Sequence, residues 1–371
     1  MKMEVFLVCQ SCGAKEPLKD AGYRCGCGGL YGLSYPKKRV DFTKTAVSME
    51  RSLYKYIDAL PFDADLAPWR GVSMGEGGTP LLQPEEGVFL KADYLMPTLS
   101  FKDRGASVLM TMAKALGVKE AVADSSGNAG TAVAAYGARA GIVCHIFAAA
   151  STSLKKLEQI KAHGATLHLI EGTREDVARA AIEYTRERGL FYASHVFQPL
   201  FYEGTKTYAY EVFEQLCFSM PDVFFLPAGN GTLVLGVYLA LTELLSWGYL
   251  KKMPQIFAVQ AEGCAPIAVA FAAGEAEVTP VENTGTAAEG IAIAAPARGA
   301  DILRAVRATN GSFFTVSDAE IFEARAALAR MGLYVETTSA ASYAAYRQWK
   351  KSGKTAGTRV VVPLCGAGLK G

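Results

Sequence analysis

Short apolar runs alternate with amphipathic stretches over most of this chain, and that alternation limits the possible folds more than any other feature. Eight runs are typical of buried strands: GVFLKADY (87–94), EAVADSS (120–126), CHIFAAA (144–150), TLHLIEG (166–172), LFYASHV (190–196), DVFFLPAG (222–229), QIFAVQAEG (255–263) and RVVVPLCG (359–366). Helices are expected at 103–116, 129–141, 154–163, 174–188, 204–218, 232–247, 318–331 and 339–352. This repetition predicts an α/β fold whose mostly parallel sheets are covered by helices on both faces.

Length and charge narrow the classes of function. The 371 residues carry a net charge of +2 with both signs interspersed, which gives no reason to expect a nucleic-acid or membrane partner. The longest apolar segment, 231–250, contains Glu243 and is interpreted as a buried helix, and the apolar run at the N-terminus is too short for a signal peptide. We therefore expect a cytoplasmic protein with two or more structural units.

Four of the eight cysteines crowd into the first 27 residues, as Cys9-x2-Cys12 and Cys25-x-Cys27. Paired thiolates followed by glycine, which lets the backbone turn tightly round a metal, are typical of a structural tetrahedral zinc site. The second pair is one residue shorter than the usual spacing, and the alternative is a small ribbon that keeps its turns without metal. Either way, residues 1–36 form a zinc-ribbon-like segment that does no chemistry.

Two strand-to-helix loops look suited to anions. In the first, residues 124–141, the hydroxyls of Ser125 and Ser126 and the amide of Asn128 stand at the start of a helix; the alternative is a plain serine N-cap. In the second, residues 226–236, Gly229, Gly231 and Thr232 could wrap a phosphate. Its glycine spacing fits neither a dinucleotide fingerprint nor a nucleotide P-loop.

Two further features complete this set of groups. Cys365 ends a strand in a third glycine-bearing loop, and Lys102 lies in PTLSFKDRGASV (97–108) at the mouth of an apolar helix. A lysine amine, a phosphate cradle and a second anion cradle suggest pyridoxal phosphate. The amine forms a Schiff base with the aldehyde, one loop holds the phosphate and the other holds a substrate carboxylate.

Four motifs occur in a familiar order: SFKDRG, SSGNAG, GNGT and GAGLK, preceded by GEGGTPLL (75–82). Together they resemble the fold-type II pyridoxal-phosphate enzymes over nearly the whole chain, and within these the threonine synthases most. The resemblance implies an enzyme that converts O-phosphohomoserine and water to threonine and phosphate, and a homodimer. It also implies a large cofactor-binding domain formed by 37–99 and 206–371 and a small mobile domain at 100–205.

The resemblance also assigns roles to residues. Lys102 would bind the cofactor covalently and act as general acid and base, Asn128 would bind the ring hydroxyl, and Cys365 would face the pyridine nitrogen, where the family usually has Ser or Thr. The phosphate cradle would be Gly229, Asn230, Gly231 and Thr232. The substrate carboxylate would meet Ser125, Ser126, Gly127 and Ala129. The substrate phosphate would meet Ser194, His195 and Lys206, with Lys155 or Lys156 as further donors.

Three departures from the family keep other reactions open. Phe201 stands about where the threonine synthases have a phosphate-binding arginine, Ala367 replaces a histidine, and TAAEGIAIAAPARG (286–299) resembles the dehydratases more closely. The alternatives are a serine/threonine dehydratase-like ammonia-lyase or a β-replacement enzyme acting on a non-phosphorylated amino acid. A non-catalytic metabolite-binding protein is a third, which the presence of Lys102 and both cradles disfavours.

Overall fold

The structure is a computed structural model that describes residues 4–18, 22–152, 154–353 and 357–370. Two compact units make up the chain. Unit 1 comprises Met1–Gly77 and Lys102–Thr205, and unit 2 comprises Gly78–Phe101 and Lys206–Gly371. The chain therefore passes from unit 2 into unit 1 at the peptide bond that precedes Lys102.

Unit 1 contains a small antiparallel ribbon and a four-stranded parallel sheet in the order β8-β7-β6-β9. Its elements are β1 (Phe6–Cys9), β2 (Lys15–Pro17), β3 (Tyr31–Ser34), α1 (Phe42–Ala46), η1 (Leu53–Ala59), η2 (Pro68–Gly71), α2 (Lys102–Ala115), β6 (Glu120–Ala123), α3 (Asn128–Ala140), β7 (Val143–Ala149), α4 (Leu154–Ala162), β8 (Thr166–Ile170), α5 (Arg174–Arg188), β9 (Phe191–Tyr192) and α6 (Pro199–Thr205).

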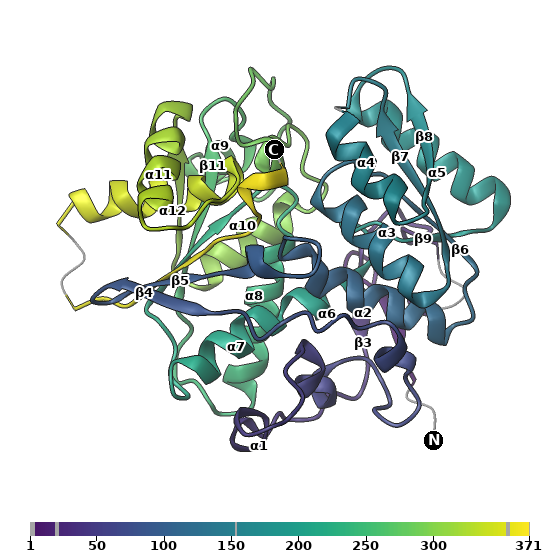
Figure 1. Cartoon of the computed structure of the whole chain (residues 1–371), viewed down its shortest axis with the longest axis horizontal. Coiled ribbons are helices and arrows are strands. Elements are labelled where there is room, and N and C mark those ends of the chain that lie inside the picture. The colour runs from purple at the N-terminus through teal and green to yellow at the C-terminus, as the bar shows by residue number, and fades with distance from the viewer. Residues whose placement is uncertain (1–3, 19–21, 153, 354–356, 371) are drawn as a thin grey trace. The chain divides into compact units, whose positions relative to one another are not determined.

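Both faces of the sheet in unit 1 are apolar. Successive side chains of a strand point to opposite faces, and apolar residues of β6 point to each of them. On β6, Ala121 and Ala123 belong to the core cluster shared with α2 and α3, whereas Val122 packs with Val177 and Ala181 of α5. In Figure 1, α5 accordingly covers one face of this sheet, and α3 and α4 cover the other. The sheet is thus the doubly covered parallel type that the sequence predicts.

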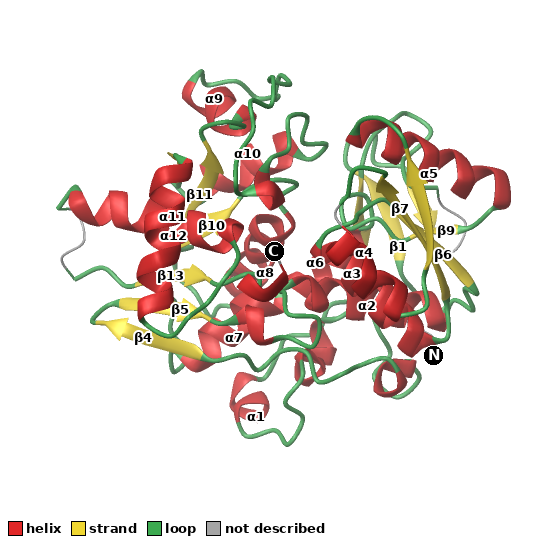
Figure 2. Ribbon diagram, turned by 45° about the horizontal axis from the view of Figure 1, so that its top comes forward, coloured by secondary structure: helices red, strands yellow, loops and turns green. Residues whose placement is uncertain are grey.

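Unit 2 is built on a six-stranded sheet in the order β12-β11-β10-β13-β5-β4, parallel except for β4. Figure 2 shows α11 and α12 on one face of it and α7, α8 and α10 on the other. Its elements are β4 (Leu81–Glu85), β5 (Val88–Lys91), η3 (Asp93–Leu95), α7 (Thr207–Gln215), β10 (Val223–Pro227), α8 (Thr232–Ser246), β11 (Gln255–Ala261), α9 (Pro266–Ala272), η4 (Glu289–Ile291), α10 (Gly299–Ala308), β12 (Ser312–Val316), α11 (Asp318–Arg330), α12 (Thr337–Lys351), β13 (Val360–Pro363) and η5 (Gly368–Lys370).

The predicted α/β fold with mostly parallel sheets is confirmed, and each of the eight expected strands overlaps an observed one. Two of the differences are instructive. The helix expected at 204–218 is two helices, α6 and α7, and the strand β12 with the preceding helix α10 was missed. The prediction of one continuous helix was wrong, because α6 ends at Thr205 and α7 begins at Thr207, with Lys206 between them.

Residues 37–77, which we expected to join 206–371 in one domain, instead pack in unit 1 against α2. The Tyr54 hydroxyl lies 2.9 Å from Ser107 Oγ and 2.7 Å from Thr111 Oγ1. The buried Glu76 carboxylate accepts hydrogen bonds from Ser107 and, at 3.0 Å, from Tyr136. Buried polar groups that satisfy one another in this way tie the segment to α2.

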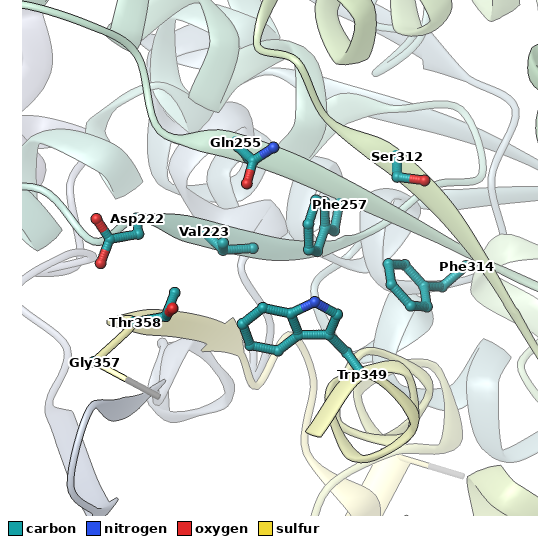
Figure 3. Close-up of a pocket in the computed structure, with 9 residues that line it drawn as sticks. All are labelled: Asp222, Val223, Gln255, Phe257, Ser312, Phe314, Trp349, Gly357 and Thr358. Atoms are coloured by element: carbon teal, nitrogen blue, oxygen red, sulfur yellow. The ribbon is translucent and has the colours of Figure 1, made fainter. Parts of the chain in front are cut away.

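The described residues of unit 2 also line a cavity of ≈520 Å³ at the amino-terminal ends of its strands. Phe257, Phe314 and Trp349 form its apolar side, and Asp222 and Thr358 stand at the other end (Figure 3). In parallel α/β sheets ligands bind at the opposite, carboxyl-terminal edge, so this cavity is not the candidate active site.

Among the residues that the structure describes, every helix is too short or too polar to span a bilayer.

Candidate active site

Lys102 is the first residue of α2, and the chain just before it is held by the segment that contains Cys365. The backbone N–H of Phe101 donates to the carbonyl oxygen of Cys365 over 2.9 Å, and Ser100 pairs with Gly366. Cys365 is buried. The last turn of chain ahead of the lysine is therefore fixed to the end of β13, as a lysine needs if its amine must be held in place.

Unit 1 brings together two of the predicted segments at the carboxyl ends of neighbouring strands. The loop that carries Ser125, Ser126 and Asn128 follows β6, and the segment with Ser194 and His195 follows β9, which pairs with β6. The Ala193 N–H donates to the Val122 carbonyl over 2.7 Å and continues this pairing. Parallel strands thus deliver both segments to one edge of the sheet.

The loop after β6 is folded tightly over the start of α3. A Cβ on Gly130 would lie 1.6 Å from the Ser125 carbonyl oxygen, so only glycine allows this approach. Ser125, Ser126 and Asn128 are half-buried, Gly127 is exposed and Ala129 is buried. The loop therefore presents backbone groups of the first turn of α3 together with two hydroxyls.

The glycine loop of unit 2 follows β10 and leads into α8. Gly231 adopts φ +75°, and a Cβ on it would lie 2.4 Å from Ile302 Cδ1. A Cβ on Gly229 would lie 2.8 Å from the Gly290 carbonyl oxygen. The loop is thus packed against residues 290 and 302 on one side. Asn230 is half-buried and Thr232 buried. Because β10 pairs with β13, this loop and Cys365 follow neighbouring strands.

Both of these helices begin at a glycine. Gly127 caps α3 and Gly231 caps α8, and neither helix has a side-chain cap. By contrast, α5 and α11 begin with complete capping boxes. Glycine cannot satisfy the first-turn N–H groups with a side chain, so these donors of α3 and α8 are suited to bind an external anion.

His195 is buried close to the amine of Lys102. Burial is the main cause that lowers the pKa of His195 well below its usual value, and the positive charges of Lys102 and then Arg174 lower it further. The imidazole is therefore neutral at pH 7. A neutral ring can donate one hydrogen bond to an oxyanion but brings no charge of its own.

This pKa shift predicts a pH dependence of stability. Below about pH 6.5 the unfolded chain binds a proton at His195 that the folded chain does not, so the free energy of unfolding falls as pH drops. The contribution is at most about 1.4 kcal/mol per pH unit. We expect His195→Gln to weaken the decline between pH 6.5 and 5 in urea unfolding. Equal slopes for both proteins would contradict the assignment.

Phe201 lies beside both Lys102 and His195. Its ring centroid is 5.8 Å from Lys102 Nζ and 6.0 Å from the His195 ring. The ring also packs directly on α2, since a Cβ on Gly105 would lie 2.2 Å from Phe201 Cδ1. Phe201 is fully buried. Phe201, which stands about where the threonine synthases have a phosphate-binding arginine, thus packs as an apolar side chain against α2, the helix that begins with Lys102.

A double-mutant cycle tests this contact. Gly105→Ala overfills the space and should destabilise the protein by about 1–3 kcal/mol, more than the gain of about 0.5–1 kcal/mol from helix propensity. Adding Phe201→Leu should relieve the clash, so that the two effects couple by at least about 0.5 kcal/mol in thermal or urea unfolding. Strict additivity would mean that the ring does not pack on Gly105.

Lys206 does not remain a candidate for the substrate phosphate. Its side chain is fully buried in unit 2, and Nζ lies 3.1 Å from Glu243 Oε1, while the Tyr210 hydroxyl donates to Glu243 Oε2. A buried ion pair is costly to break. The side chains of Lys155 and Lys156 lie outside the part of the chain that the structure describes.

Sequence reasoning missed Gln198, which follows His195 by three residues. Its side chain is buried, and its Oε1 atom accepts no hydrogen bond from the described residues. Its N–H donates to the Ser194 carbonyl over 3.0 Å, so the residue belongs to the same turn. A buried acceptor without a partner is typical of a ligand site, but no local motif in the sequence marks this glutamine.

The described groups of the two units are all suited to bind anions or to react with an aldehyde. An amine stands at a helix start, two glycine-capped helices offer N–H donors for anions, and a neutral imidazole lies near the amine. Within unit 1, the amine can form a Schiff base with an aldehyde and the start of α3 can bind a carboxylate. Within unit 2, the start of α8 can bind a phosphate.

Comparison with known proteins agrees with this chemistry. Residues 72–366 match the family described as pyridoxal-phosphate dependent enzyme. The chain is 34% identical to a threonine synthase of Methanosarcina acetivorans over 92% of this chain and 86% of that protein. It is 32% identical to a threonine synthase of Methanocaldococcus jannaschii over 98% and 92%. The fold resembles the processed form of threonine deaminase isoform 2 from Solanum lycopersicum, with a TM-score of 0.69, 22% identity and 81% of each chain covered. This chain belongs to the pyridoxal-phosphate dependent enzyme family.

Proposed function

We propose that this enzyme is a threonine synthase, which converts O-phosphohomoserine and water to threonine and phosphate. The observation that carries the proposal is the 34% identity to a threonine synthase over 92% of the chain. The site supports it, because a lysine at a helix start and two glycine-capped helix N-termini fit the aldehyde and phosphate of the cofactor and the carboxylate of an amino acid.

When bound, pyridoxal phosphate would supply an electron sink for the electron pair left at the substrate Cα. Lys102 would hold the cofactor covalently and then move protons at the substrate Cα and Cβ. The first turn of α8, with Gly229, Asn230, Gly231 and Thr232, would bind the cofactor phosphate. Asn128 would bind the ring hydroxyl, and Cys365 would face the pyridine nitrogen as a neutral partner.

The substrate would be oriented by unit 1. Ser125, Ser126, Gly127 and Ala129 would donate hydrogen bonds to the carboxylate at the start of α3. Ser194 and neutral His195 would donate to the leaving phosphate, and Gln198 would accept a hydrogen bond from the attacking water. Orientation of this kind places the Cα proton within reach of the Lys102 amine.

Two observations favour a second function. The buried Phe201 offers no charge to a substrate phosphate, and Lys206 is neutralised by Glu243. An ammonia-lyase that acts on serine or threonine, or a β-replacement enzyme, needs no such charge. The non-catalytic reading has no comparable support, because Lys102 and both glycine-capped helices are present.

The test is the product formed by the purified, cofactor-loaded chain. With O-phosphohomoserine we expect inorganic phosphate and threonine in equal amounts. Release of ammonia and a 2-oxo acid from serine or threonine, without turnover of O-phosphohomoserine, would overturn the proposal in favour of the ammonia-lyase. We also propose a homodimer, which light scattering on the eluting protein would test.

A further inference from the structure

Four thiols of the N-terminal ribbon converge on one point. The Sγ atoms of Cys9, Cys12, Cys25 and Cys27 all lie within 4.8 Å of one another. Cys9 Sγ is 3.5 Å from Cys27 Sγ, and Cys12 Sγ is 3.7 Å from Cys25 Sγ. A disulfide needs about 2.05 Å. Thiolates on a tetrahedral zinc with Zn–S bonds of about 2.3 Å lie about 3.8 Å apart, which is close to the two distances of 3.5 and 3.7 Å.

The turns explain the unequal spacing of the two cysteine pairs. In the first, the Gly13 N–H donates to the Cys9 carbonyl over 3.0 Å, a span of four residues. In the second, the Gly28 N–H donates to the Cys25 carbonyl over 2.8 Å, a span of three. Gly13 and Gly28 both have positive φ, +75° and +85°. The second turn is thus one residue shorter and still brings its thiols to the same point.

A third glycine keeps the two turns in contact. A Cβ on Gly29 would lie 2.5 Å from Cys9 Sγ and 2.7 Å from Ser11 Oγ. Any side chain there would push the first turn off the second. Cys9 and Cys25 are buried, whereas Cys12 and Cys27 are exposed. The cluster therefore lies at the edge of the ribbon, where a metal ion can enter.

The second turn also touches the candidate active site of unit 1. The Arg24 guanidinium donates to the Gly28 carbonyl over 2.9 Å and lies 5.0 Å from the centroid of the Phe197 ring. The Tyr23 ring packs edge-on against Phe197, with centroids 5.3 Å apart. Phe197 lies between His195 and Gln198. The residues just before Cys25 thus support the segment 194–198.

We propose that the four thiolates bind one Zn²⁺ ion, and that this ion fixes the turn from which Tyr23 and Arg24 hold the segment 194–198 in place. Zinc suits the site because four thiolates in a closed tetrahedron leave no open position, which is typical of a structural ion. The thiols lose their protons to solvent on binding, and no redox partner is needed. Tyr23 and Arg24 are positioning residues.

The first experiment measures the metal in the full-length protein. We expect one zinc per chain by elemental analysis and four sulfur neighbours at about 2.3 Å by X-ray absorption. Cys12→Ser/Cys27→Ser should lose the zinc, whereas Cys217→Ser, an exposed cysteine of unit 2, should keep it. If the double variant fails to fold, release of zinc from the wild-type chain by a mercurial, in proportion to thiols modified, replaces it. Absence of metal, or iron in place of zinc, would overturn the assignment.

The second experiment measures the support of the segment by hydrogen exchange, which requires no knowledge of the substrate. Removal of zinc should make amides of residues 192–198 exchange roughly tenfold faster, while those of β10 and β11 in unit 2 stay unchanged. Arg24→Gln should have the same local effect with zinc retained, and Arg24→Lys should restore protection in part, because a lysine still offers a cation to the ring. Unchanged exchange at 192–198 would overturn the positioning role, whatever reaction the enzyme performs.

Discussion

Replacing Lys102 with alanine should abolish turnover, with a loss of at least about 10³-fold in kcat, because the variant lacks both the covalent hold on the cofactor and the group that moves protons. The purified variant should also lose the visible absorbance of the lysine-bound cofactor. The measurement is product formation under saturating substrate and cofactor, together with the absorption spectrum.

Lys114→Ala is a matched control, since Lys114 lies in the last turn of the same helix α2. It should retain both activity and spectrum. Substantial activity in the Lys102 variant would show that another group transfers the protons, and the assignment of the site to the start of α2 would fail.

Gly231→Val should strip the enzyme of its cofactor. Valine is strongly disfavoured at φ +75°, and its Cβ would lie 2.4 Å from Ile302 Cδ1, so the first turn of α8 must move. If this distortion costs about 1.4 kcal/mol of binding free energy, the affinity for the cofactor phosphate falls tenfold. Cofactor content after dialysis and a binding titration followed by absorbance would measure this.

Gly248→Val separates the effect of the cradle from that of backbone strain. Gly248 lies just beyond the other end of α8 at φ +78°, and a Cβ there meets no atom within 4 Å. This control carries a similar strain without a clash, and it should keep its cofactor. Equal loss in both variants would mean that general destabilisation, and not the glycine loop, explains the result.

Local signals were enough to predict many of the helices and strands and the loops that connect them, although not α10 and β12. The helix expected at 174–188 coincides with α5, because Thr173 and Asp176 form a capping box and Gly189 ends the helix at φ +61°. The loops that we propose for anion binding could be located because parallel strands place the residues that follow them at one edge of the sheet. The roles of the individual loop residues stay predictions until cofactor binding is measured.

Contacts between distant segments could not be predicted in the same way. Lys206 looked available for a substrate phosphate, but its partner Glu243 lies on another helix, and nothing near Lys206 in the sequence reveals it. The grouping of residues 37–77 with α2 depends on Tyr54 and Glu76 meeting Ser107 in space. The sequence alone identified Phe201 as a departure from the threonine synthases. That its ring packs on Gly105 could be seen only in the structure.

The order of strands in unit 2 has a consequence for synthesis of the chain. Strand β13 lies between β10 and β5, although β5 precedes it by most of the chain. On the ribosome, β5 and its neighbour β4 must wait while the second part of unit 1 is made, and β10 emerges later still. Until β13 arrives, β5 and β10 each present an unpaired edge to other nascent chains, which is a hazard for aggregation. Protection of these two edges until β13 emerges would limit such association.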